Sequence, residues 1–213
     1  MQFKSEVKPS SWIRILTHLA GLAPLVILGW HYAAGRLGFN PVEAVIQQTG
    51  RIAIVFLLLS LACTPIHNVF NLPTVKRLRT PLGLYAVLYA ALHLAAFALW
   101  DYGMNLQLIW NAVLEKPFIL VGLLALLILA VLALTSPRAV QRKMGKAWKR
   151  LHRWVYLAAV LAIAHYLLAI KGNLWQLQGN YTPPLAAASI LLVLFLLRWQ
   201  VVYLPLRRFF HRD

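Results

Sequence analysis

The sequence predicts an all-α integral membrane protein, built as a six-transmembrane-helix bundle with both termini in the cytoplasm. Of its 213 residues, 61% are hydrophobic and only 12% are charged, and the mean hydropathy is +0.69. A soluble domain of this length would need far more charged side chains to cover its surface. The apolar residues fall into six segments, each close to the ~20 residues that cross a bilayer as a helix.

The basic residues fix the expected orientation. The formal charge is +16, yet Lys and Arg cluster in short connections between apolar segments instead of spreading over one folded face. Alternate connections are poor in them and hold only Arg36, Lys116 and Lys171. This asymmetry is typical of the positive-inside rule and not of a nucleic-acid-binding surface. It places both termini in the cytoplasm.

The first three spans follow a polar cytoplasmic leader, residues 1–11. Residues 12–32 begin at Trp12 and end near Trp30 and Tyr32, as interface aromatics do, and we expect this span to be retained instead of cleaved as a signal peptide. Residues 44–63 form the second span, ending at a Thr-Pro pair, and a basic loop runs to residue 80. Residues 81–100 form the third.

The last three spans are equally apolar. Residues 117–135 contain no charge and begin with a proline, which suits a first helical position. The most basic connection of the chain leads to residues 154–171, and a polar loop leads to residues 185–204. Residues 205–213 are a basic cytoplasmic tail. Residues 12–204 thus form one transmembrane domain of six spans. We find no internal repeat of the kind seen in transporters.

The single cysteine, Cys63, excludes an intrachain disulfide and a multi-thiolate zinc site, and we expect it to serve packing. No connection is long enough to form a soluble catalytic domain. Chemistry must therefore take place on a bound cofactor, in the membrane or in a partner.

Two histidines lie deep in apolar spans. His93 is about 10 Å below the outer end of the third span and His165 about 9 Å below that of the fifth, at 1.5 Å per residue. These two spans run in the same direction, so both imidazoles reach one level. This arrangement suits axial ligation of a haem iron from both faces. The alternative is a pair of interhelical hydrogen bonds.

Three further residues are candidates for cofactor binding. Arg51 enters from the outer end of the second span, where it would pair with a haem propionate or extend to the membrane surface. His152 lies about 20 Å from His165 along the fifth span and would serve a second haem. Arg79, at its level, cannot ligate iron, so a second haem would have another partner or no second protein ligand. His18 is the candidate partner, or else a satisfied packing histidine.

The basic segment at residues 141–154, QRKMGKAWKRLHRW, has two interpretations. It forms an amphipathic segment on the lipid surface, or it cradles an anionic cofactor such as a flavin phosphate. Its spacing does not distinguish them.

Several stretches resemble a known family. They are HLAGLAP (18–24), TGR (49–51), RTPLGLYAVLYAALHL (79–94), TSPRAVQRKMGKAW (135–148) and LHRWVYLAAVLAIAHYL (151–167). Over essentially its full length the chain resembles the ferric reductase-like transmembrane domain shared with NADPH oxidases. Within that family it is most similar to the haem-binding membrane subunits of bacterial methionine sulfoxide reductase systems.

This resemblance implies a function. It implies electron transfer from membrane quinones through haem b, with FMN also attributed to the family, to a periplasmic molybdopterin methionine sulfoxide reductase that repairs oxidised proteins. The implied localisation is the bacterial inner membrane. The family's haem histidines fall on His93, His152 and His165, whereas Arg79 stands where the oxidases have a fourth histidine. The flavin and nicotinamide domain of the oxidases has no counterpart in this sequence, so electrons must come from elsewhere.

Two other functions use the same residues. In a transporter or channel, His93, His165 and Arg51 would line a proton or anion path. In a structural anchor for a partner, both histidines would be replaceable. A red preparation whose Soret band shifts on reduction favours haem, and a colourless folded one favours transport.

Overall fold

The structure, a computed structural model, describes residues 11–170, 179–199 and 204–205, which are helical with short connections. The expected leader, the end of the fifth span at residue 171 and most of the tail lie outside these residues. The helices are α1 (Ser11–Ala33), α2 (Pro41–Phe70), α3 (Pro73–Ala96), α4 (Leu106–Glu115), α5 (Pro117–Leu134), α6 (Arg138–Met144), α7 (Lys146–Leu151), α8 (Val155–Leu168) and α9 (Thr182–Leu196). A π-helical segment, Phe97–Asp101, extends α3, and a 3₁₀ turn, His152–Trp154, precedes α8.

Five helical segments are long and apolar enough to cross a membrane: Ile15–Ala33, Pro41–Phe70, Pro73–Asp101, Pro117–Leu134 and Lys146–Leu168. The sixth expected span corresponds to α9, which is apolar but has 15 residues within the described part of the chain. Large apolar side chains point outward along these helices, as Leu134 at 76% exposed and Leu192 at 60% exposed illustrate. Such a surface is unfavourable in water and suits contact with lipid tails. The chain is a multi-pass membrane protein.

The second and third spans form a longer helical hairpin than the sequence indicates. We expected a helix end at residues 64 and 65 and a loop to residue 80, but α2 continues to Phe70 and α3 begins at Pro73. Pro65 is accommodated inside α2, where it is buried. A proline costs a helix one backbone hydrogen bond, and packing against neighbouring helices offsets that loss in membrane helices. The turn itself is made by Asn71, which adopts the left-handed conformation at φ 53°.

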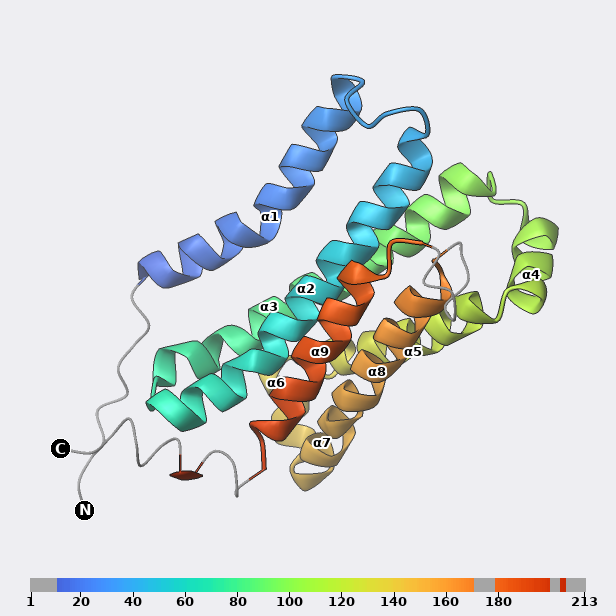
Figure 1. Ribbon diagram of the computed structural model, residues 1–213. Coiled ribbons are helices and arrows are strands. Elements are labelled where there is room, and N and C mark those ends of the chain that lie inside the picture. Colours follow the sequence, from blue (N-terminus) through green and yellow to red (C-terminus); the bar gives the residue numbers. More distant parts are fainter. Residues whose placement is uncertain (1–10, 171–178, 200–203, 206–213) are drawn as a thin grey trace, which may run out of the picture.

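The core lies where this hairpin meets α8 and α9. One cluster of buried side chains joins α2, α3, α5, α8 and α9, and Tyr89 and Ala158 at its centre are fully buried, at 0% exposed. Phe56 of α2 stacks on Tyr89 of α3 with ring centres 5.5 Å apart. Figure 1 shows α9 lying alongside α2 and α8, with α5 beside α8. A second hairpin, α5 with α8, thus packs against the first.

Helix α1 lies on the outside of the α2–α3 hairpin (Figure 1). Two tyrosines of α3 attach it. The Tyr89 hydroxyl donates to the Gly21 carbonyl at 2.8 Å, and the Tyr85 hydroxyl lies 2.9 Å from Nδ1 of His18. In an apolar setting such polar contacts locate a helix that hydrophobic packing alone would leave free to slide.

The two ends of the bundle differ in charge. The end where α2 and α5 finish, with α6 and α7, is here called the basic end (Figure 1). Its cations in α3, α6 and α7 are Lys76, Arg77, Arg79, Arg138, Arg142, Lys143, Lys146, Lys149 and Arg150. The three acidic residues of the described chain, Glu43, Asp101 and Glu115, lie at the opposite end, here called the acidic end.

The Tyr89→Phe variant tests how α1 is attached. It removes the hydroxyl that binds the Gly21 carbonyl, and we expect a loss of stability of about 1 kcal/mol, seen as a melting temperature a few degrees lower in detergent. Tyr32→Phe is the matched control, because Tyr32 is 49% exposed and stacks on Trp100. Equal melting temperatures for the two variants would contradict this role for Tyr89.

Candidate functional site: two apposed histidines

His93 of α3 and His165 of α8 lie next to each other inside the bundle. Their ring centres are 5.9 Å apart, and the ring planes are inclined by 82°. Both side chains are half-buried. The two histidines that the sequence placed at one level therefore also face one another across the helix interface.

Each imidazole is held by a backbone carbonyl of the neighbouring helix. Nδ1 of His93 lies 2.8 Å from the carbonyl oxygen of Ile46 in α2, and Nδ1 of His165 lies 2.7 Å from that of Phe118 in α5. A carbonyl oxygen only accepts, so Nδ1–H donates in both pairs. In the neutral ring, Nε2 then carries the free lone pair. This is the tautomer in which histidine ligates a metal, with the other ring nitrogen fixed by a hydrogen bond.

A glycine makes room for each imidazole ring. It lies one helical turn after the residue whose carbonyl accepts the hydrogen bond. A Cβ atom placed at Gly50 would lie 3.0 Å from Nδ1 of His93, and one placed at Gly122 would lie 2.6 Å from Nδ1 of His165. The contact at Gly122 would force the ring of His165 to move, whereas the one at Gly50 would require the ring of His93 to give way by a few tenths of an ångström. Glycine therefore gives each imidazole room to reach the carbonyl of the adjacent helix.

The two hairpins repeat this arrangement with identical spacing. Each histidine is 47 residues after the residue whose carbonyl it binds. Gly50 and Gly122 are 72 positions apart in the sequence, and so are His93 and His165. The same separation relates three buried residues of the first hairpin to three of the second, namely Ala53, Leu57 and Ala86 to Ala125, Leu129 and Ala158. We expected no internal repeat of the kind seen in transporters. The structure shows a repeat of α2–α3 in α5–α8, with both copies running in the same direction.

The paired histidines fit axial ligation of a metal held between them. With metal–nitrogen bonds of about 2.0–2.1 Å, two imidazoles on opposite sides of one ion have ring centres about 6 Å apart. The observed 5.9 Å agrees with that spacing. Among the described residues no group of three or more His, Cys, Asp or Glu side chains comes together. A porphyrin supplies the equatorial nitrogens itself, so the protein need supply only axial ligands.

His152 and His18 have separate partners. The rings of His152 and Trp148 are tilted against each other with their centres 3.9 Å apart, and Nδ1 of His152 lies 3.3 Å from the Trp148 carbonyl oxygen. His18 is exposed on α1 and lies against Tyr85. The structure thus brings together His93 and His165, and it places His152 and His18 in different contacts.

Arg51 follows Gly50 directly but points away from the histidines. Its side chain is exposed and donates from Nη2 to Gln47 Oε1 at 3.1 Å, and Gln47 in turn donates to Glu43 at 3.1 Å. These residues form a row along one face of α2 that leads to the acidic end. This is the geometry of an arginine that extends toward the membrane surface.

Sequence reasoning missed two features of this region. The first is the pair Gly50 and Gly122, which comparison of the two hairpins at equal spacing could have found. The second is Arg198, whose guanidinium contacts the Tyr156 hydroxyl and donates from Nη2 to the Leu61 carbonyl at 2.6 Å. It joins α9 to α8 and α2, and a basic residue near the end of an apolar span gives no signal of such contacts.

Fold and site together define a polytopic helical membrane protein with paired histidines suited to an embedded redox cofactor. The chain belongs to the ferric reductase-like transmembrane component family, whose model matches residues 49–163. The match covers just over half of the chain, begins beside Gly50 and includes His93 and His152, while His165 lies two residues beyond it. Members of this family generally bind haem and related redox cofactors.

Gly122→Ala tests the contact between helix backbone and ligand. The new methyl group would meet Nδ1 of His165 at 2.6 Å, so the ring must leave the Phe118 carbonyl. We expect haem content to fall severalfold, measured as the ratio of Soret to protein absorbance. Gly29→Ala is the control, because a Cβ there has nothing within 4 Å. Full haem content in the Gly122 variant would show that His165 needs no such support.

Proposed function

We propose that this chain is the haem-carrying electron-transfer subunit of a bacterial methionine sulfoxide repair system, of the MsrQ type. In this proposal it takes electrons from membrane quinones and delivers them to a periplasmic molybdopterin methionine sulfoxide reductase of the MsrP type. The observation that carries the proposal is the pair of Nδ1–H···O=C bonds, which leaves Nε2 of both apposed histidines free as a ligand. Membership of the ferric reductase-like family supports electron transfer in the membrane.

His93 and His165 would hold haem b through their free Nε2 atoms. Bound haem supplies reversible one-electron chemistry at its iron, with a potential set by the axial ligands and the polarity of the surroundings. The protein contributes rigid orientation, since each ring is fixed at its second nitrogen. It also contributes a dry setting, because the core beside the pair is lined by buried aromatic and aliphatic side chains such as Phe56, Tyr89 and Ile163.

The basic end would face the cytoplasm and the acidic end the periplasm of an inner-membrane protein, following the positive-inside rule. The apposed histidines lie nearer to the acidic end, since Asp101 follows His93 by eight residues, about 12 Å along the helix. A carrier held there would be close to a periplasmic acceptor. His152 lies toward the basic end and would bind a second haem or line the entry of electrons. FMN belongs to the proposal by family resemblance alone.

Replacing either apposed histidine tests the central claim. His93→Ala and His165→Ala should each abolish most of the low-spin haem spectrum, because only one imidazole would remain to hold the haem. His31→Ala, at the end of α1, should leave the spectrum intact. The measurement is the reduced-minus-oxidised difference spectrum of the purified protein. A colourless wild-type protein that is folded, or full haem retention in both variants, would reject the proposal.

The role of His152 is separable from that of the pair. His152→Ala should remove or shift one component of a redox titration while the component assigned to His93 and His165 keeps its potential. The wild-type haem-to-protein ratio is measured alongside. A titration that the substitution leaves unchanged would mean that His152 binds no haem and that the chain carries a single one.

A further inference from the structure

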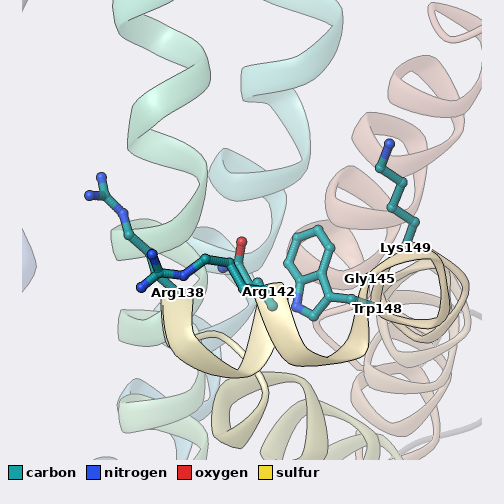
Figure 2. Close-up of a pocket in the computed structure, with 6 residues that line it drawn as sticks. Arg138, Arg142, Gly145, Trp148 and Lys149 are labelled. Carbon is teal, nitrogen blue, oxygen red and sulfur yellow. The ribbon is translucent and has the colours of Figure 1, made fainter.

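The basic end carries a hollow outside the histidine site. It has a volume of about 450 Å³ and is lined by Arg138, Gln141, Arg142, Gly145, Trp148 and Lys149 of α6, α7 and the turn between them. Figure 2 shows the Trp148 indole in the middle of this group, with the side chains of Arg138 and Lys149 rising on either side. The hollow is open to the outside of the protein.

Its uncharged polar groups are already used within the protein. The Trp148 indole N–H donates to the Thr135 carbonyl at 2.9 Å, and the Gln141 amide donates to the Ser136 carbonyl at 2.6 Å. Both acceptors belong to the connection that follows α5. These bonds fix α6 and α7 against the end of the bundle and hold the indole in place. The three cationic side chains remain for a ligand.

No protein carboxylate at this end of the described chain can neutralise those cations. The three described acidic residues lie at the acidic end, a membrane thickness away. Within the part of the chain that the structure describes, these cations have no carboxylate partner, and a bound anion would supply the counter-charge. Arginine favours phosphate, which it binds with two parallel hydrogen bonds.

The position of the hollow identifies the source of the phosphate. It lies where α5 ends and the α7–α8 segment begins, that is, where two spanning segments leave the hydrocarbon. Leu134 and Trp154, at these two points, are 76% and 53% exposed, as lipid-facing residues are. Tryptophan is typical of the headgroup level, where its ring contacts the glycerol and upper acyl region. Basic pockets on this side of membrane proteins suit anionic headgroups.

We propose that the hollow between α6 and α7 is a binding site for the phosphate headgroup of an anionic phospholipid. Arg138, Arg142 and Lys149 bind the phosphate, and the Trp148 ring packs against the glycerol and upper acyl chain. The Trp148 ring also packs against His152, so the bound lipid lies one side chain away from that histidine. The site goes beyond the proposed electron transfer, and it stands whether or not haem is bound.

Lipid retention by the full-length protein tests this site. The protein is purified in neutral detergent and titrated with phosphatidylglycerol or phosphatidylcholine, and bound lipid is counted by native mass spectrometry. We expect saturable binding of one phosphatidylglycerol, weakened about tenfold in the Arg138→Gln/Arg142→Gln variant. The matched control is Lys143→Gln/Arg150→Gln, which removes the same charge from exposed positions of the same two helices that do not line the hollow.

Two results would overturn the proposal. Equal weakening in the lining and control variants would mean that the basic end attracts anionic lipid by net charge alone. Displacement of the lipid by equimolar FMN or inorganic phosphate, with binding lost in the lining variant, would assign the hollow to a soluble phosphate compound. Retention of the lipid against both competitors supports the lipid site. Haem content, recorded on the same samples, reports separately on the proposed function.

Discussion

The hydrogen bond from each histidine to a neighbouring helix carbonyl is the constraint on which the rest of the site depends. A carbonyl inside a helix already accepts one backbone bond, and a rigid ring from a neighbouring helix reaches its second lone pair more easily where no side chain stands one turn further along the helix. Gly50 and Gly122 create that access. The same contact therefore sets three things together: how closely the helices of a hairpin approach, where the ring lies, and which ring nitrogen is free. A histidine merely buried in the membrane would have none of these fixed.

The repeat of the α2–α3 hairpin in α5–α8 explains why two such contacts occur. Two equivalent hairpins packed against each other present their histidines from opposite sides of the contact, which is what a ligand bound on both faces requires. The two copies differ in their surroundings. Tyr85 and Tyr89 of the first copy are buried and hold α1, whereas Leu157 and Leu161, at the corresponding positions in the second, make no such polar contacts. The repeat therefore preserves the contact of each histidine with a carbonyl and a glycine of the neighbouring helix, while the outer faces contact different neighbours.

Counting residues predicted the membrane class and the equal depth of His93 and His165, because the rise of a helix is constant and lipid tolerates few alternatives to it. It did not predict the glycines that give these two imidazoles room, since a single glycine in an apolar span has no distinctive pattern. The lengths of α2 and α3 were also underestimated, because Pro65 was taken as a helix end although packing holds it inside a helix. Arg51 shows that the depth of a residue along a helix does not determine where the end of its side chain lies. The side chain is long enough to leave the level of its backbone, and in the structure it turns to Gln47.

Charge determines what each end of the bundle can bind. The described carboxylates all lie at the acidic end, where Glu43 accepts from Gln47 and so belongs to the row that includes Arg51. The basic end has cations and no described carboxylate, and charges near a membrane interior are stable only when paired. Arg198 meets this need partly with the Tyr156 ring, 4.7 Å from its guanidinium carbon, and with a backbone carbonyl. Arg138, Arg142 and Lys149 have no such internal arrangement, and they surround a hollow instead. An anionic headgroup bound in that hollow, as proposed above, would supply the charge that no described carboxylate provides at this end.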